Sequence, residues 1–149
     1  MKWDFRRRFG FLVSDVARLY GQQFDRLARE KIGLSQAQCR LLGVLAAHGD
    51  GHMSQAELAQ RLGLSAMAVG GMCDRMASAG WLRREAHATD RRINQLHLEP
   101  SASKALSSAM DIGDALSARA LAGLSSAERT QLLSLLDKAR NALLEEKTS

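Results

Sequence analysis

The stretch SQAELAQRLGLSAMAVGGMCDRMASAGWLRREAHATDRRINQLHL, residues 54–98, decides the fold. It opens with Ser54 and Glu57, a capping-box pair in which the hydroxyl accepts from a helix N–H and the carboxylate reaches back to the cap. Gly63 ends this first short helix. The apolar residues of the next segment have the spacing of a helix with one buried face: Val69, Met72, Cys73 and Met76. Two short helices joined by a tight turn that contains glycine predict a helix-turn-helix.

Residues 81–98 alternate like two short strands around a charged turn, and such a hairpin directly after a helix-turn-helix is a wing. Four arginines lie within ten residues of it: Arg83, Arg84, Arg91 and Arg92. Successive residues of a strand point to opposite faces. At most one of Arg83 and Arg84 therefore faces outward to a ligand, and the other covers the protein with its aliphatic stem.

Duplex DNA explains why arginines gather at this turn. It carries one negative charge about every 1.7 Å of its axis. The second helix of the motif fits the major groove, and the hairpin beside it reaches the adjacent backbone or the minor groove, where a narrow groove attracts arginine. A net charge of +5 and a pI near 9.8 agree with a polyanionic partner.

Helices are also expected before this stretch. From Phe5 to Leu27, apolar residues recur in steps of three and four and predict a long amphipathic helix that ends near Gly33. Ser35 with Gln38 forms another capping pair and opens the next helix. Two glycines are expected to stop that helix: Gly49 and Gly51.

After the hairpin, Pro100 stops strand pairing and helical spacing resumes over residues 101–124. Ser125 with Glu128 opens the last helix. One face of that helix is apolar: Leu132, Leu135, Leu136, Ala139 and Leu143. The sequence predicts a mainly α fold with a small β-hairpin wing (α+β). A chain of 149 residues, 46% hydrophobic and 25% charged, is expected to form one domain over residues 1–149.

The sequence lacks the motifs that mark several other classes of protein. Cys39 and Cys73 lie far apart without a CxxC pair, as in proteins of a reducing compartment. The apolar patch near the N-terminus, broken by Asp15 and Arg18, is shorter than the ~7–15 residues of a signal-peptide core, and the cytoplasm is the expected location. Glycine-rich phosphate loops, GxSxG and HExxH are missing, and the histidines lack ligand spacing. We expect no enzyme, no metal and no cofactor.

Residues 34–98 resemble the MarR family of bacterial winged helix-turn-helix transcription factors. The flanking helices also fit in number and position, so the resemblance covers nearly the whole chain. The resemblance rests on SQAELAQRLGLS, on CDRMASAGWLRR and on the triplet DRR, residues 90–92, at the right separations. It implies a homodimer held by helices at about 1–33 and 101–149, with a DNA-binding lobe at about 34–100. Such proteins usually repress, and many release a near-palindromic DNA operator on binding a small aromatic or lipophilic effector or on sensing an oxidant.

The resemblance assigns roles to single residues. Arg91 corresponds to the wing-tip arginine that enters the minor groove, while Arg92 and Asp90 brace the wing or touch phosphate. Arg75 bonds phosphate or supports the wing. The remaining residues expected to contact DNA lie on the helix-turn-helix and the first wing strand: Ser54, Gln55, Ser65, Ala66, Met67, Gly70, Gly71 and Arg84.

The exposed face of the second helix departs from the family, which often has threonine, arginine or glutamine there. Ala66 and Met67 suit thymine methyl groups, so shape and wing contacts are expected to carry more of the selectivity. Gly70 and Gly71 each disfavour a helix interior by roughly 1 kcal/mol against alanine. Either they permit a close approach of the backbone to phosphates or they fit a tight packing site, and the sequence favours neither.

The helix that contains Cys39 is expected to line an effector pocket. The candidate residues are Val13, Val16, Tyr20, Gln38, Cys39 and Leu42. Three interpretations of Cys39 are open: it senses an oxidant, it enlarges the pocket, or it is an inert buried thiol. The inert thiol is preferred, because no lysine or histidine adjoins Cys39 in sequence to lower its pKa. Packing is also the preferred interpretation of Cys73.

Two alternatives to an effector-responsive repressor stay open: a redox-sensing repressor that uses Cys39, and an architectural protein that binds DNA without operator preference. A homodimer is expected, because a monomer would expose the apolar faces of both terminal helices.

Overall fold

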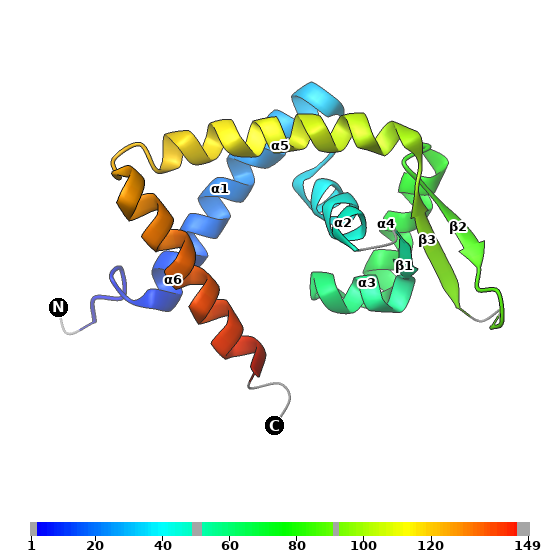
Figure 1. The fold of residues 1–149 in the computed structure, drawn as a ribbon, viewed down its shortest axis with the longest axis horizontal. Coiled ribbons are helices and arrows are strands. Elements are labelled where there is room, and N and C mark those ends of the chain that lie inside the picture. Colours follow the sequence, from blue (N-terminus) through cyan, green and yellow to red (C-terminus); the bar gives the residue numbers. More distant parts are fainter. Residues whose placement is uncertain (1–2, 49–51, 91–92, 146–149) are drawn as a thin grey trace. The chain divides into compact units, whose positions relative to one another are not determined.

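The computed structural model describes residues 3–48, 52–90 and 93–145. The chain order in these ranges, followed in Figure 1, is α1 (Phe9–Ile32), α2 (Gln36–Ala47), β1 (His52–Ser54), α3 (Gln55–Leu62), α4 (Ala66–Ser78), β2 (Leu82–Ala86), β3 (Asn94–Leu98), α5 (Pro100–Ala120) and α6 (Ser126–Glu145). The predicted mainly α fold with a β-hairpin is confirmed. The helix-turn-helix is α3–α4 and the wing is β2–β3.

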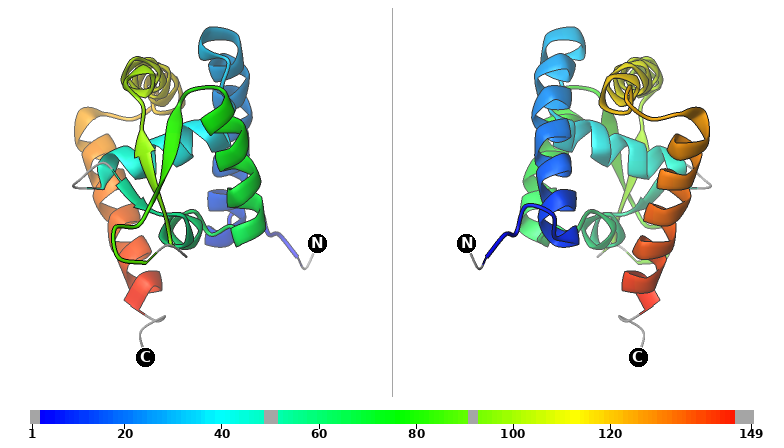
Figure 2. Two further views of the ribbon diagram at one scale, coloured as in Figure 1. Left: turned by 90° about the vertical axis from the view of Figure 1, so that its right-hand side faces the viewer. Right: turned by 90° about the vertical axis from the view of Figure 1, so that its left-hand side faces the viewer.

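The sheet has one strand more than the sequence predicted. Strand β1 pairs antiparallel with β3, which also pairs antiparallel with β2, so the strand order is β1-β3-β2. In the wing, Arg84 lies opposite Leu96 and Arg83 opposite His97. Strand β2 packs against α4, and the left view of Figure 2 shows the two elements next to each other. Strand β1 thus ties the start of the helix-turn-helix to the wing.

The predicted caps begin most helices where expected. Ser35 and Gln38 form both halves of a capping box on α2, and Ser125 and Glu128 do the same before α6. Glycines in the left-handed region end α1 and α3: Gly33 at φ 70° and Gly63 at φ 67°.

One expected helix boundary was wrong. Helix α1 begins at Phe9 rather than Phe5, because Arg8 is extended and its N–H closes a turn onto the Phe5 carbonyl at 2.9 Å. Helix α2 ends at Ala47, with the extended His48 as its cap residue, close to the expected stop. Gly49 and Gly51 lie outside the described residues.

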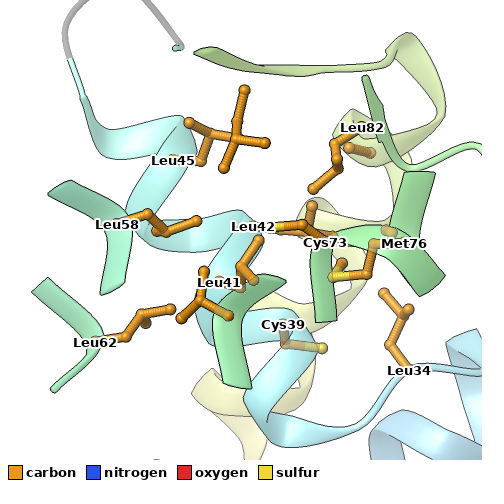
Figure 3. Packing of buried hydrophobic residues seen from close by; sticks show 14 of the residues in the cluster. Leu34, Cys39, Leu41, Leu42, Leu45, Leu58, Leu62, Cys73, Met76 and Leu82 are labelled. Carbon is orange, nitrogen blue, oxygen red and sulfur yellow. The ribbon is translucent and has the colours of Figure 1, made fainter. Parts of the chain in front are cut away.

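Buried aliphatic side chains hold the helix-turn-helix against α2 and the sheet. Figure 3 shows Leu41, Leu42 and Leu45 of α2 facing Leu58 and Leu62 of α3, with Cys73 and Met76 of α4 and Leu82 of β2 in the same cluster. The predicted inner face of α4 is confirmed: Val69, Cys73 and Met76 are fully buried and Met72 is half-buried. The opposite face of α4 is consequently left toward solvent.

The chain divides into two compact units, one up to Gly113 and one from Asp114 onward, with α5 crossing the boundary. In the second unit, no described residue of α6 is buried. Its leucines, including Leu133, Leu135 and Leu143, are largely exposed in the single chain. No helix in the described ranges combines the length and apolarity that crossing a membrane requires.

Candidate nucleic-acid interface

The first turn of α4 is the most open part of the helix-turn-helix. The Ser65 hydroxyl accepts from the Ala68 N–H at 3.1 Å and caps the helix. Ser65, Ala66 and Met67 are exposed, and the Met67 side chain is 88% exposed. No acidic residue lies in this turn. The positive end of the helix dipole and its free N–H groups therefore face solvent without a competing carboxylate.

The two glycines of α4 have different surroundings. A Cβ on Gly70 would lie 3.3 Å from the Gln55 amide nitrogen, which is tighter than ordinary contact. A Cβ on Gly71 would meet only the end of the Arg75 side chain, at 3.6 Å. Tight packing therefore accounts for Gly70 but not for Gly71, where a close approach of DNA stays a prediction.

Arg84 joins the wing to both helices of the motif. Its Nε and Nη2 donate to Gln55 Oε1 at 3.1 and 3.0 Å, and Nη2 also donates to the Gly70 carbonyl at 3.1 Å. Its Nη1 forms an ion pair with Asp74. The side chain is only 28% exposed. These contacts fix strand β2 against the start of α3 and the middle of α4.

Arg83 lies on the other face of the wing, as the strand alternation predicted. It pairs with Glu85 at 2.9 Å and with Glu99 at 3.2 Å and is 48% exposed. The Arg83 guanidinium lowers the pKa of the Glu85 carboxyl, and His97 and His52 add to this effect. Arg83 thus belongs to a charged cluster on the outer face of the sheet.

The residues at the start of α3 that are expected to contact DNA also form hydrogen bonds within the chain. The Ser54 hydroxyl caps α3 by accepting from the Glu57 N–H at 3.1 Å. The reciprocal half of the predicted capping box is not formed among the described residues, because the Glu57 carboxylate accepts from Arg61 instead. The side-chain carbonyl of Gln55 accepts a hydrogen bond from Arg84.

The wing turn is described only in part. Arg75 on α4 is exposed, and Asp90 is half-buried at the start of the tip. The Asp90 carbonyl accepts from the Ile93 N–H at 3.1 Å and helps close the turn. Arg91 and Arg92 lie outside the described residues, so their contact with DNA stays a prediction.

Sequence reasoning missed His87, which organises this turn. Its Nδ1 lies 3.2 Å from the N–H groups of Thr89 and Asp90. The sequence offers one signal for this role, which is an acceptor side chain at His87 two residues before the Thr89 N–H. Such an arrangement is more usual for asparagine and aspartate.

The six candidate pocket residues do not share one environment. Leu42 and Cys39 are buried in the core at 1% and 7% exposure. Gln38 is engaged in the cap of α2, and the Tyr20 hydroxyl donates to the Gly113 carbonyl at 3.3 Å. The remaining two, Val13 and Val16, are exposed on α1. Contact of these residues with a ligand stays a prediction.

Burial raises the pKa of both thiols. For Cys39 the nearby Asp25 carboxylate adds to this effect, and for Cys73 the Arg84 guanidinium opposes it. A raised pKa leaves less thiolate, the reactive form. This agrees with the preferred interpretation of both cysteines as inert packing residues.

The fold and this surface define the class: a winged helix-turn-helix protein with long helices at both ends. A sequence model described as the MarR family matches residues 32–93, which cover α2 to the end of the wing turn. The resemblance expected from the sequence is thereby confirmed for this segment. MarR-family proteins are transcription regulators, not enzymes.

Solved structures of known regulators share this fold. MarR from E. coli in its apo form is 20% identical with a TM-score of 0.77, covering 88% of this chain and 95% of its own. A MepR–DNA complex from S. aureus is 22% identical with a TM-score of 0.76, covering 90% and 97%. BpsR of Bordetella bronchiseptica, whose DNA binding is regulated by 6-hydroxynicotinic acid, is 20% identical with a TM-score of 0.77, covering 93% and 96%. A search of curated protein sequences gives no match.

Proposed function

We propose that this protein is a transcriptional regulator that binds a near-palindromic duplex operator as a homodimer and represses until a small aromatic or lipophilic effector binds. The observation that carries the proposal is the pairing of the open N-terminus of α4 with a wing that Arg84 fixes beside it. Two elements held rigidly together can enter a major groove and reach the neighbouring backbone at once.

Selectivity on this surface depends more on DNA shape than on base contacts. The exposed start of α4 offers Ala66 and Met67, which suit thymine methyl groups but cannot donate hydrogen bonds from their side chains to base edges. Backbone N–H groups and the arginines at the tip of the wing are proposed to supply the contacts to the DNA backbone. The preferred operator is therefore expected to have a narrow minor groove where each wing lies.

The homodimer is supported by apolar surface that a single chain leaves uncovered. On α1, Phe9, Leu12, Val16 and Leu19 are each about half exposed or more. On α6, five leucines are also exposed: Leu133, Leu135, Leu136, Leu143 and Leu144. Soluble monomers rarely keep patches of this kind. Two copies would carry two α4 helices, which need a separation of about 34–36 Å to enter successive major grooves.

Effector control is supported by likeness to a regulator whose ligand is known. DNA binding by BpsR is regulated by 6-hydroxynicotinic acid, a small aromatic acid. A ligand that binds one separation of the two α4 helices more tightly than another shifts the population toward it and weakens DNA binding. Val13, Val16 and Tyr20 of α1, with Gln38, Cys39 and Leu42 of α2, are the residues proposed to respond.

The test is a titration of the purified protein against DNA selected from random fragments, with an unselected duplex of equal length as the control. A specific regulator binds the selected duplex about 10³-fold or more tightly than the control. Equal affinities would favour the architectural alternative. Light scattering on the same sample is expected to give twice the chain mass of 16.3 kDa. Val16→Glu, which places a charge in the proposed interface, is expected to lower both mass and affinity.

A further inference from the structure

One apolar side chain projects from the face of α4 that is open to solvent. Within residues 65–71, the inward side chain of Val69 is fully buried, whereas that of Met67 is 88% exposed. The other exposed residues of this stretch have short side chains: Ser65, Ala66 and Ala68. Of the described residues 65–71, only Met67 therefore has an exposed side chain that extends more than one atom beyond its Cβ.

Two glycines leave room beside Met67. Residues three and four positions apart are neighbours on a helix surface, and the residues at these positions after Met67 are Gly70 and Gly71. A Cβ on Gly71 would meet only the end of the Arg75 side chain, at 3.6 Å, so the surface is open there. The edge of a base pair can therefore come close to α4 and still leave space for one protruding thioether.

The position of Met67 along α4 brings it to the end of the helix that enters a groove. Met67 is the second residue of α4, and side chains on a helix tilt toward its N-terminus. In a helix-turn-helix, the N-terminal residues of the second helix are those that contact base edges. The first turn of α4 contains no acidic residue that would repel the duplex. A base edge in the major groove is therefore the surface that Met67 is placed to meet.

The chemistry of a thioether restricts what Met67 can recognise. Its sulfur is only a weak hydrogen-bond acceptor and donates nothing. The apolar feature of the major groove is the C5-methyl group of thymine, and methionine adapts well to an irregular apolar contact. 5-Methylcytosine carries a methyl group at the same position, although its amino group donates where the oxygen of thymine accepts. A thioether therefore distinguishes a methylated pyrimidine from an unmethylated one and is nearly indifferent to the rest of the base pair.

We propose that Met67 is the specificity-determining residue of α4 and that it reads the C5-methyl group of one pyrimidine in each half of the operator. Thymine and 5-methylcytosine provide this contact, whereas uracil and cytosine do not. The inference rests on the proposed function, because it names the chemical group of the duplex that the α4 surface selects. It also makes methylation of cytosine at this position a modification of the DNA that strengthens binding.

Base analogues test the contact from the side of the DNA. Each thymine of the selected operator is replaced in turn by uracil, which keeps the pairing with adenine and removes only the methyl group. We expect one position in each half of the operator where this change weakens binding about fourfold, the effect of burying one methyl group. At that position, a duplex with 5-methylcytosine paired with guanine should bind more tightly than one with cytosine, by about the same factor.

Variants of Met67 assign the effect to its side chain. Met67→Ala loses the contact in both halves of the operator, so it should bind the thymine operator about tenfold more weakly. The two affinity ratios, thymine to uracil and 5-methylcytosine to cytosine, should both fall to about one. Met67→Leu keeps an apolar side chain of similar size and should keep most of each ratio.

Two controls separate a lost contact from a damaged protein. Met110 is also exposed, at 69%, but lies on α5 outside the helix-turn-helix, so Met110→Ala should keep both affinity ratios. Because the Met67 side chain is exposed, Met67→Ala should leave the midpoint of urea unfolding unchanged.

The outcomes distinguish this inference from the proposed function. A wild-type protein that binds its selected operator with both affinity ratios near one at every position would overturn the inference and keep the proposed function. Ratios that persist in Met67→Ala would also overturn it, because the methyl group then acts through the shape of the DNA. A protein that binds the selected and unselected duplexes equally would overturn both proposals.

Discussion

Arg84 donates two hydrogen bonds to the side-chain carbonyl of Gln55, at 3.1 and 3.0 Å, and so connects the wing to the first residue of α3. The same guanidinium reaches Gly70 and Asp74 on α4. A planar guanidinium suits this task because its donors have fixed directions. The relative position of the wing and α4 is therefore set within the chain, before any DNA is bound.

Arg84→Ala should behave as the loss of a support rather than of a DNA contact. We expect it to lower the free energy of unfolding by about 1 to 3 kcal/mol, because hydrogen-bonding groups of Gln55 and Gly70 lose their partner. Operator affinity should fall while the slope of its logarithm against log salt stays unchanged. Arg83→Ala, on the other face of the strand, is the matched control. A slope that flattens by about one unit in Arg84→Ala would instead show a direct phosphate contact.

Local patterns explain what the sequence predicted well. Ser35, Ser54 and Ser125 cap helices through donors only three residues away, so the pattern and the contact lie in the same short segment. The buried face of α4 likewise follows from helical spacing alone. The helix-turn-helix and the wing could be predicted because each is a local motif.

Contacts between distant segments account for what was missed. Strand β1 spans only His52–Ser54, too short for an alternating pattern, and it exists because β3 offers it a partner 40 residues or more along the chain. The partners of Arg84 lie up to 29 residues away in sequence. Such pairings depend on how the elements pack, which no spacing rule contains.

Gly71→Ala distinguishes a packing role from close approach to DNA. The added methyl group meets only the end of the Arg75 side chain, so helix propensity should raise the free energy of unfolding by about 0.5 to 1 kcal/mol. Gly70→Ala, which crowds Gln55, should gain less or lose stability. If the backbone of α4 approaches phosphate at Gly71, operator affinity falls in Gly71→Ala despite the gain in stability. Unchanged affinity in a more stable protein would reject that approach.

The Asp25 carboxyl makes the free energy of unfolding depend on pH in the acid range. Its Oδ1 accepts from the Gln36 N–H at 2.9 Å at the start of α2, and its Oδ2 accepts from Arg29 at 2.7 Å. The bond from Gln36, and then that from Arg29, lowers the pKa of the Asp25 carboxyl in the folded chain. A lowered folded pKa contributes stability that is present above the ordinary pKa of about 3.9 and is lost as pH falls through the folded value.

Asp25→Asn should therefore remove part of the acid sensitivity. The amide oxygen can still accept from Gln36 but carries no charge. Urea unfolding from neutral pH down to about pH 2.5 should show a difference between wild type and variant that shrinks below about pH 4. Asp25→Ala, which removes the acceptor as well, should cost about 1 kcal/mol at neutral pH. A constant difference between wild type and Asp25→Asn at all pH values would contradict the assignment.

Cys39→Ser tests whether a thiol senses oxidants. Burial raises the pKa of Cys39, so little thiolate exists at neutral pH and peroxide should react slowly. We expect the operator affinity of wild type and Cys39→Ser to respond alike to peroxide. We also expect the Cys39 thiol to react with a chromogenic disulfide no faster than the DNA-binding lobe unfolds locally. Cys73→Ser is the matched control, since Cys73 is also buried. A peroxide response present in Cys73→Ser and lost only in Cys39→Ser would establish the redox-sensing alternative.

Arg91→Ala tests the tip of the wing, where the family resemblance places the minor-groove contact. Each phosphate neutralised by an arginine releases condensed counterions, so its loss should flatten the salt dependence by about one unit of slope and weaken binding several-fold. Arg140→Ala removes the same charge from α6, where Arg140 pairs with Asp137, and leaves the wing intact. Both variants lose one positive charge, so a contact at the tip is expected to show as a flatter slope in Arg91→Ala than in Arg140→Ala. Identical titrations for the two variants would exclude Arg91 from the interface.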